Sequence, residues 1–255
     1  MNVLVVGAGD VGTWLGDTVA TELDAADLVF ADTDEDAAAT AAAALGGRAV
    51  PTGTDERFDV VCLAVPIPAL KPAVDEWGSA ADRAVVDVTG VMEPAVAAMR
   101  SAAPTVERVS LHPLFAPDAA PGNVAVVPDA PGPVTDHLRR ALSAAGNDLF
   151  ETTAPEHDEA METVQARVHA AVLAFGLAAE DVPEKFQTPV STAMFGLLDR
   201  VTGNDPRVYA DIQAAFDGAG DVADAAADLA EADDETFEAC YRAAARDGDR
   251  GPGPP

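Results

Sequence analysis

The sequence has few of the residues that build disulfides, metal clusters and basic surfaces. Its 255 residues include two cysteines and four histidines, and aromatic side chains make up only 5%. Cys62 lies in an apolar run and Cys240 in a helical stretch, so we expect reduced thiols in a cytoplasmic protein and no disulfide. The cysteines and histidines are not grouped as a zinc site requires, so we expect no metal.

Long apolar runs are missing as well. No run approaches the roughly 18 residues of a membrane span. The chain starts directly with a strand-like segment and lacks the basic region that opens a signal peptide, so we expect neither feature. Hydrophobic residues still make up 49% of the chain, which is enough to bury a sizeable core in one large domain or two modest ones.

Positive charge is scarce. Fifteen lysines and arginines face 44 acidic residues, and the net charge is −29. Such a charge disfavours binding to nucleic acid or to an anionic membrane. The acidic residues are spread along helices and loops, as in cytoplasmic proteins of extreme halophiles, where salt screens the self-repulsion. The alternative is an ordinary acidic protein with a basic partner.

A glycine-rich turn follows the first apolar run, Val3–Val6. It reads GAGDVG, and it comprises Gly7, Ala8, Gly9, Asp10, Val11 and Gly12. In the dinucleotide-binding fingerprint, the first glycine allows the tight turn, the second lets the backbone approach a pyrophosphate, and the third brings the helix close to the strand. The N–H groups at the start of the helix favour the negative charge of the diphosphate.

An acidic residue stands at the end of the second apolar run. Asp32 follows Leu28–Ala31, twenty residues after Gly12, where it can bind both ribose hydroxyls and repel a 2′-phosphate. No lysine or arginine follows within the next four residues, so the sequence favours NAD over NADP. The alternative is a glycine turn in an α/β domain that binds no nucleotide.

Apolar runs and alanine-rich helical stretches alternate over the first 150 or so residues. The pattern predicts an α/β fold with a mostly parallel Rossmann-type sheet at residues 1–152, which would bind NAD. Ligands bind beyond the carboxyl ends of the strands in such sheets. Three polar or proline-containing segments fall there: Ala64–Pro66, which includes Val65, Asp87–Gly90, and Ser110–Pro113. The predicted strands are Val3–Val6, Leu28–Ala31, Arg48–Val50, Val60–Val65, Ala84–Val88, Val106–Leu111 and Val124–Val127.

Strand signals stop near Pro155, and helical periodicity takes over. We predict an all-helical domain for substrate binding and dimerisation at residues 153–246, followed by a disordered tail at 247–255. One apolar stripe on its first helix suggests packing against a second copy of the chain. The stripe consists of Met161, Val164, Val168, Val172 and Phe175.

Two histidine-containing segments are candidates for chemistry. His112 lies just after a predicted strand and before Pro113, which places it at the ligand edge, where an imidazole can accept a proton as a hydride leaves an alcohol. It can instead cap the strand. His157 and His169 fall on the first helix of the second domain. His169 and Gln165 border the apolar stripe, where they can face a cleft or face water.

Two further polar positions are less informative by themselves. His137 occupies a position typical of a solvated helix surface. Arg200 lies near the end of a helix, where it can bind a carboxylate or meet the helix C-terminus, and spacing alone favours the second interpretation.

Together these segments resemble the prephenate/arogenate dehydrogenase family over residues 1–245. The matching motifs are Gly7–Gly12, Ala64–Pro66, Asp87–Gly90, His112–Pro117, Glu156–Asp158 with Gln165 and His169, and Arg200 to Ile212. The resemblance implies NAD-dependent oxidation and decarboxylation of prephenate in tyrosine biosynthesis, by a homodimer. His112 is then the catalytic histidine that assists deprotonation of the ring hydroxyl. His169 lines the substrate site with Gln165 and His157, and Arg200 binds a substrate carboxylate.

The sequence departs from the family pattern after the fifth predicted strand. The family's Asp-x-x-Ser-x-Lys reads Asp87 to Met92 here, with Gly90 at the serine position and Met92 at the lysine position. Thr89 is a candidate to supply the missing hydroxyl as part of the catalytic site. Three alternatives stay open at this point: arogenate as the substrate, a different small-acid or imine reductase, and a non-catalytic NAD-sensing module.

Overall fold

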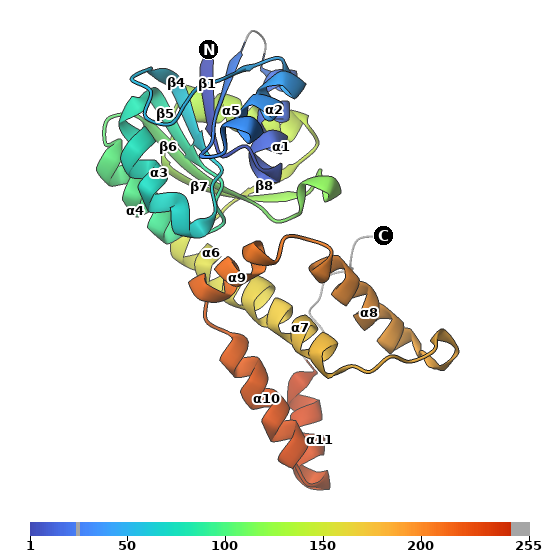
Figure 1. Ribbon diagram of the computed structural model, residues 1–255. Coiled ribbons are helices and arrows are strands. Elements are labelled where there is room, and N and C mark those ends of the chain that lie inside the picture. The colour runs from blue at the N-terminus through green and yellow to red at the C-terminus, as the bar shows by residue number, and fades with distance from the viewer. Residues whose placement is uncertain (24–25, 246–255) are drawn as a thin grey trace. The chain divides into compact units, whose positions relative to one another are not determined.

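A computed structural model describes residues 1–23 and 26–245 of the chain (Figure 1). The predicted disordered tail at 247–255 lies outside the described residues. The chain forms two compact units. The first comprises Met1–Met161 with Arg207–Ala215, and the second comprises Glu162–Pro206 and the residues from Phe216 onward.

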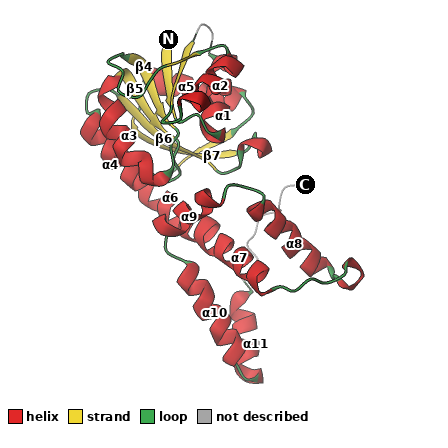
Figure 2. Ribbon diagram, viewed as in Figure 1, coloured by secondary structure: helices red, strands yellow, loops and turns green. Residues whose placement is uncertain are grey.

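The first unit is built on one eight-stranded sheet (Figure 2). Its order is β3-β2-β1-β4-β5-β6-β7-β8, and every neighbouring pair is parallel except β6 and β7. The predicted α/β class with a mostly parallel sheet is therefore confirmed. The strands are β1 (Asn2–Val6), β2 (Asp27–Ala31), β3 (Arg48–Ala49), β4 (Phe58–Leu63), β5 (Ala81–Asp87), β6 (Glu107–Pro113), β7 (Asn123–Ala130) and β8 (Asp148–Glu151).

Helices cover both faces of this sheet. Figure 1 shows α1, α2 and α5 on one face and α3 and α4 on the other. Continuous apolar strands such as Val3–Val6 are buried because both faces are covered. The helices are α1 (Asp10–Glu22), α2 (Glu35–Leu45), α3 (Leu70–Trp77), α4 (Met92–Ala102), α5 (Pro133–Ala144), α6 (Ala154–Met161) and α9 (Pro206–Ala215), with short 3₁₀ turns η1 (Ile67–Ala69), η2 (Gly78–Ala80) and η3 (Pro117–Ala119).

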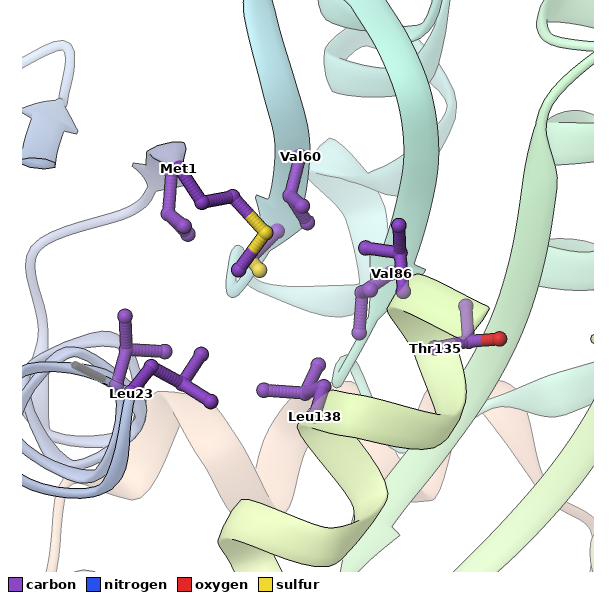
Figure 3. A pocket seen from close by; sticks show the side chains of 10 residues that line it. Met1, Leu23, Val60, Val86, Thr135 and Leu138 are labelled. Carbon is purple, nitrogen blue, oxygen red and sulfur yellow. The ribbon is translucent and has the colours of Figure 1, made fainter. Parts of the chain in front are cut away.

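A small pocket lies inside this core. Figure 3 shows it enclosed by Val60 and Val86 of the sheet, Leu138 of α5, and Leu23 and Met1. The lining is almost entirely aliphatic, so the pocket is a packing gap in the core and offers a polar ligand nothing to bind. Cys62 also borders it, and burial raises the pKa of this thiol to about 12, which keeps it neutral.

The second unit is entirely helical over its described residues. Its α7 packs on α8 through the edge-on rings of Phe175 and Phe195, whose centroids are 5.2 Å apart. Arg167 pairs with Asp221 of α10 at 2.5 Å. The elements are the π-helix η4 (Glu162–Arg167), α7 (Val168–Ala178), the 3₁₀ turn η5 (Glu184–Phe186), α8 (Pro189–Thr202), α10 (Ala219–Glu231) and α11 (Asp234–Ala244).

The predicted apolar stripe does not form one buried face within the chain. Met161 and Val172 are 3% and 4% exposed, whereas Val164 and Val168 are 53% and 48% exposed. The reason is the π-helical segment Glu162–Arg167, whose wider turns break the 3.6-residue period on which the stripe was predicted. No helix in the described part of the chain is long and apolar enough to cross a membrane.

Candidate active site

Two glycines of the turn between β1 and α1 have no room for a side chain. Gly7 has a φ of +97°, and a Cβ on it would lie 2.1 Å from the carbonyl oxygen of Ala64. A Cβ on Gly12 would lie 1.9 Å from the carbonyl oxygen of Gly7. The chain therefore needs glycine at both positions for β1, the turn and α1 to approach each other.

Gly9 has a different environment. A Cβ built on it meets no atom within 4 Å. Gly9 is also the N-cap of α1, and no side chain caps the helix there. The first turn of α1, which contains Asp10 and Val11, thus leaves uncapped N–H groups beside open space. This arrangement favours an anion such as a phosphate.

Asp32 follows β2 directly and supports the same turn. Its Oδ2 accepts a hydrogen bond from the N–H of Ala8 at 2.7 Å, and its Oδ1 accepts one from the N–H of Asp34 at 2.9 Å. Val65 packs beside Gly7, since its Cγ1 lies 3.4 Å from the position of a Cβ there, and Pro66 caps η1. The predicted cofactor-binding segments of β1, β2 and β4 therefore meet at one edge of the sheet.

The end of β5 carries a buried carboxyl group. Asp87 is fully buried, accepts a hydrogen bond from the Ser110 hydroxyl at 2.7 Å, and accepts another from the N–H of Thr89 at 3.1 Å. Burial raises its pKa to about 7, although the hydrogen bond from Ser110 acts in the opposite direction.

His112 lies inside β6, whereas the sequence analysis placed it just after the strand. The strand continues to Pro113 because β7 pairs with it antiparallel, with His112 opposite Ala125. The imidazole is buried, and its Nδ1 lies 2.8 Å from Nε2 of His157. Burial, followed by the neighbouring His157, lowers the pKa of His112 to about 3, so the ring is neutral at neutral pH.

His157 occupies a different place from the one expected. It is 3% exposed, lies on α6 in the first unit, and packs edge-on against His112 with ring centroids 5.0 Å apart. We expected it to share one helix with His169, and helical residues do run without a break from Ala154 to Ala178. Part of this run, Glu162–Arg167, is π-helical, and the two histidines fall in different compact units.

Asp158 joins this pair to the start of α4. Its Oδ1 lies 2.7 Å from Nδ1 of His157, and its two oxygens accept the N–H groups of Met92 and Glu93 at 3.0 and 2.9 Å. Burial would raise the pKa of Asp158, but the hydrogen bonds from His157, Met92 and Glu93 outweigh it and lower the pKa. A carboxylate therefore faces His157.

The departures from the family motif have structural counterparts. Gly90 has a φ of +88°, and a Cβ on it would lie 3.1 Å from Nε2 of His112. Met92 is fully buried in a cluster with Val96 and Ala125. The Thr89 hydroxyl oxygen is buried, and this side chain interacts with the carboxyl group of Asp87. A serine at 90 would be strained, and a lysine at 92 would be buried in apolar surroundings.

The remaining predicted substrate ligands belong to the second unit. Gln165 lies on the π-helix, His169 on α7, and Arg200 on the exposed surface of α8 near its end. Burial lowers the pKa of His169. The Asn204 side chain donates to the carbonyl oxygen of Arg200. Their participation in a site with His112 stays a prediction.

From the sequence, Asp158 was part of a motif but had no predicted role. Its position next to His157 was the one indication of a role, and only the fold shows that α6 brings both residues to β6 and α4. Asp87 was likewise predicted only as the end of a strand. Its partner Ser110 stands opposite it in the parallel pair of β5 and β6, a pairing that sequence spacing does not reveal.

A family model matches residues 2–90, and it is described as NADP oxidoreductase, coenzyme F420-dependent. Among curated proteins, the 4-amino-4-deoxyprephenate dehydrogenase of Streptomyces pristinaespiralis is 37% identical over 173 residues, which cover 63% of this chain and 58% of that protein. A probable arogenate/prephenate dehydrogenase of Methanocaldococcus jannaschii is 26% identical over 173 residues, covering 62% and 39%. The chain matches about half the length of these curated relatives.

Solved structures show the same fold. The prephenate dehydrogenase of Aquifex aeolicus, crystallised with hydroxyphenyl propionate and NAD⁺, superposes with a TM-score of 0.70 at 17% identity, covering 96% of both chains. The arogenate dehydrogenase of Synechocystis gives a TM-score of 0.61 at 17% identity, also covering 96% of both. In its curated homologues and in its fold, the chain is similar to the prephenate and arogenate dehydrogenases.

Proposed function

We propose that this protein is an NAD-dependent dehydrogenase that oxidises and decarboxylates prephenate to 4-hydroxyphenylpyruvate in tyrosine biosynthesis. The observation that carries the proposal is the buried, neutral His112 on β6, at the same edge of the sheet as the proposed dinucleotide site. The reaction needs one group that takes one proton, and a neutral imidazole at that place can do so. Thr89 is the proposed hydroxyl neighbour of the reacting groups.

The turn between β1 and α1 fits NAD. Open space beside Gly9 leaves room for a pyrophosphate against the uncapped start of α1, and Asp10 to Gly12 provide the backbone there. Asp32 offers a carboxylate to the ribose hydroxyls and would repel the phosphate of NADP. When bound, NAD supplies the acceptor for the hydride that leaves the ring carbon bearing the hydroxyl.

The protein's own residues hold the substrate and its proton. His112 accepts the proton of the ring hydroxyl as the hydride leaves, and loss of the ring carboxylate as CO₂ then makes the ring aromatic. The proposed roles of Arg200, His169 and Gln165 are to bind the anionic substrate, Arg200 through a carboxylate. The proposed partners are this small molecule and a second copy of the chain in the cytoplasm, with no nucleic acid or membrane.

A second candidate substrate is 4-amino-4-deoxyprephenate, which carries an amino group in place of the ring hydroxyl. One observation favours it: the relative with this activity in its name is 37% identical to the chain. Arogenate, whose side chain carries an amine, is a further alternative within the same chemistry. A different small-acid or imine reductase, or a non-catalytic NAD sensor, would leave all three substrates unconverted.

One assay separates these functions. The purified protein is mixed in high-salt buffer with NAD or NADP and, in turn, prephenate, arogenate and 4-amino-4-deoxyprephenate, and formation of the reduced cofactor is followed. We expect turnover with NAD and prephenate at the highest kcat/KM. A preference of tenfold or more for one of the other substrates would reassign the substrate. NAD binding without turnover of any of them would support the sensor.

A further inference from the structure

The side chains of α6 connect His112 to a carboxylate through a second imidazole. The chain of contacts runs from Nδ1 of His112 to Nε2 of His157 at 2.8 Å, and from Nδ1 of His157 to Oδ1 of Asp158 at 2.7 Å. All three residues belong to the first compact unit. We propose that Asp158 and His157 form a proton relay that fixes the tautomer of His112 and takes up the charge when His112 accepts a proton.

The proton positions follow from the ends of this relay. The Asp158 carboxylate already accepts the N–H groups of Met92 and Glu93 and can only accept from His157, so Nδ1 of His157 carries a hydrogen. In the neutral ring, Nε2 of His157 is then an acceptor, and Nδ1 of His112 must donate to it. This leaves the lone pair of His112 on Nε2, the nitrogen that faces Gly90.

Burial explains why a relay is useful here. A cation on His112 alone would be desolvated, and the pKa of this imidazole is correspondingly low. The relay avoids this desolvation cost because it moves the positive charge away from His112. The substrate proton binds Nε2 of His112, and the hydrogen on Nδ1 of His112 passes to Nε2 of His157. A bound cofactor would take up the hydride with its electron pair. His112 ends neutral, and the positive charge lies on His157, beside Asp158.

The start of α4 holds the carboxylate in place for this purpose. No side chain of α4 itself caps the helix, and Asp158 from α6 caps it instead, with the helix dipole favouring its negative charge. His157 and Asp158 are thus positioning residues that act through His112. This inference deepens the proposed function and rests on it for the identity of the substrate, but the tautomers can be measured without any substrate.

The groups that face His112 define its pH dependence. On α6 these groups are His157 and Asp158. On β5, the buried Asp87 interacts electrostatically with Asp158. On β7, the residue opposite His112 is Ala125, which carries no charge. Replacing Asp158 by asparagine removes a negative charge from the relay. The acidic limb of the kcat/KM profile should therefore move to lower pH, while the plateau falls about tenfold to a hundredfold.

The experiment begins with ¹⁵N NMR of the histidine side chains in the 255-residue chain without substrate. Only four histidines occur in the chain, so the ring nitrogens can be assigned by single substitutions. We expect His112 and His157 both to carry hydrogen on Nδ1 and not on Nε2 at neutral pH. A hydrogen on Nε2 of His112, or a cationic His112, would overturn the relay whatever the substrate is.

The kinetic part uses the substrate that the wild-type protein turns over. Asp158→Asn and His157→Gln should lower kcat with little change in KM, and Asp158→Glu should restore part of the rate. His137→Gln, on the exposed surface of α5, is the matched control and should change neither rate nor pH profile. An unshifted pH profile in folded Asp158→Asn would contradict the relay. Inactive wild-type protein with the expected tautomers would instead contradict the proposed function.

Discussion

At the scale of single residues, His112 is the group on which the proposed chemistry depends. His112→Asn keeps a side chain of similar reach but removes the base. We expect kcat to fall by about a hundredfold or more while substrate binding survives, the range for a lost general base. Steady-state kinetics measures this. His137→Asn on α5 is the exposed control, and equal kcat/KM values in both variants would show that His112 is not the base.

Gly9 allows a test of the cofactor site that leaves the fold alone. Its built Cβ contacts nothing, so Gly9→Ala should not change Tm, but the methyl group would occupy the space that a pyrophosphate needs. We expect the Kd for NAD to rise by about tenfold or more, which corresponds to roughly 1.4 kcal/mol, measured by titration calorimetry. Gly220→Ala on α10, also open, is the control. Unchanged NAD affinity in Gly9→Ala would rule out this turn as the pyrophosphate site.

Asp87 predicts a pH dependence of stability. Its folded pKa of about 7 lies above the ordinary value of 3.8, so the native state holds a proton that the unfolded chain has released. The contribution of Asp87 to stability is fully present below about pH 4 and is lost as the pH rises to about 7, by at most about 4 kcal/mol. Asp87→Asn replaces the carboxyl group by an amide of similar shape that does not titrate. Denaturant unfolding of the wild-type protein and of this variant at each pH measures the difference in their free energies of unfolding. A constant difference between pH 4 and 8 would contradict the raised pKa.

At the scale of elements, the sequence predicted the features that depend on local pattern. The strands β1 to β7 and the glycine turn were predicted from apolar runs and the turn residues between them. This works because the strands of a parallel sheet covered on both faces are continuously apolar. The strand β8 (Asp148–Glu151) was missed, since only two of its four residues are apolar and it lies at the sheet edge. The π-helical segment also left no signal, because its turns differ from the period that pattern analysis assumes.

The candidate site shows the same limit at close range. Residue types and spacing singled out His112, because a histidine before a proline at a strand end is a recognisable local motif. The contact between His112 and His157 joins residues 45 positions apart, and it depends on how α6 packs against α4 and β6. Tertiary packing of this kind cannot be deduced from periodicity, which is why the contact of the buried His157 with His112 was not predicted.

The helices of the second unit have too little buried surface to be stable alone. Val164, Val168 and Leu177 are exposed on the π-helix and α7, and none of the described residues of α8, α10 or α11 is buried. We therefore expect a second copy of the chain to cover these helices. Val168→Glu should convert a dimer into a monomer in light scattering at high salt. Phe150→Glu, an exposed position on β8 of the first unit, is the control.

A monomeric wild-type protein would contradict this prediction directly. A Val168→Glu variant that stays dimeric would place the contact elsewhere on the chain. Because a charge in an apolar interface loses its hydration, the expected loss of association is several kcal/mol, which should be visible as a change of mass at micromolar protein concentrations.

At the scale of the whole molecule, charge is the dominant feature. With 44 acidic and 15 basic residues, most carboxylates have no cation to pair with, and their mutual repulsion opposes compaction. Many of the pairs that do form, such as Arg48 with Glu56 and Lys71 with Asp75, are exposed on both sides, so each of these adds little stability. The balance between folding and repulsion should therefore be set by the ions in solution.

This argument predicts a protein that requires salt. Raising KCl from about 0.01 M to 1 M shortens the screening length from roughly 30 Å to 3 Å, which removes most of the repulsion between exposed carboxylates. Tm should increase throughout this range, with the greatest gain at the low-salt end, where the screening length exceeds the spacing of neighbouring charges. Thermal unfolding followed by circular dichroism tests this, and sucrose at matched water activity controls for general solute exclusion. A Tm that peaks at low salt would favour the ordinary acidic protein, whose negative surface is neutralised by a basic partner.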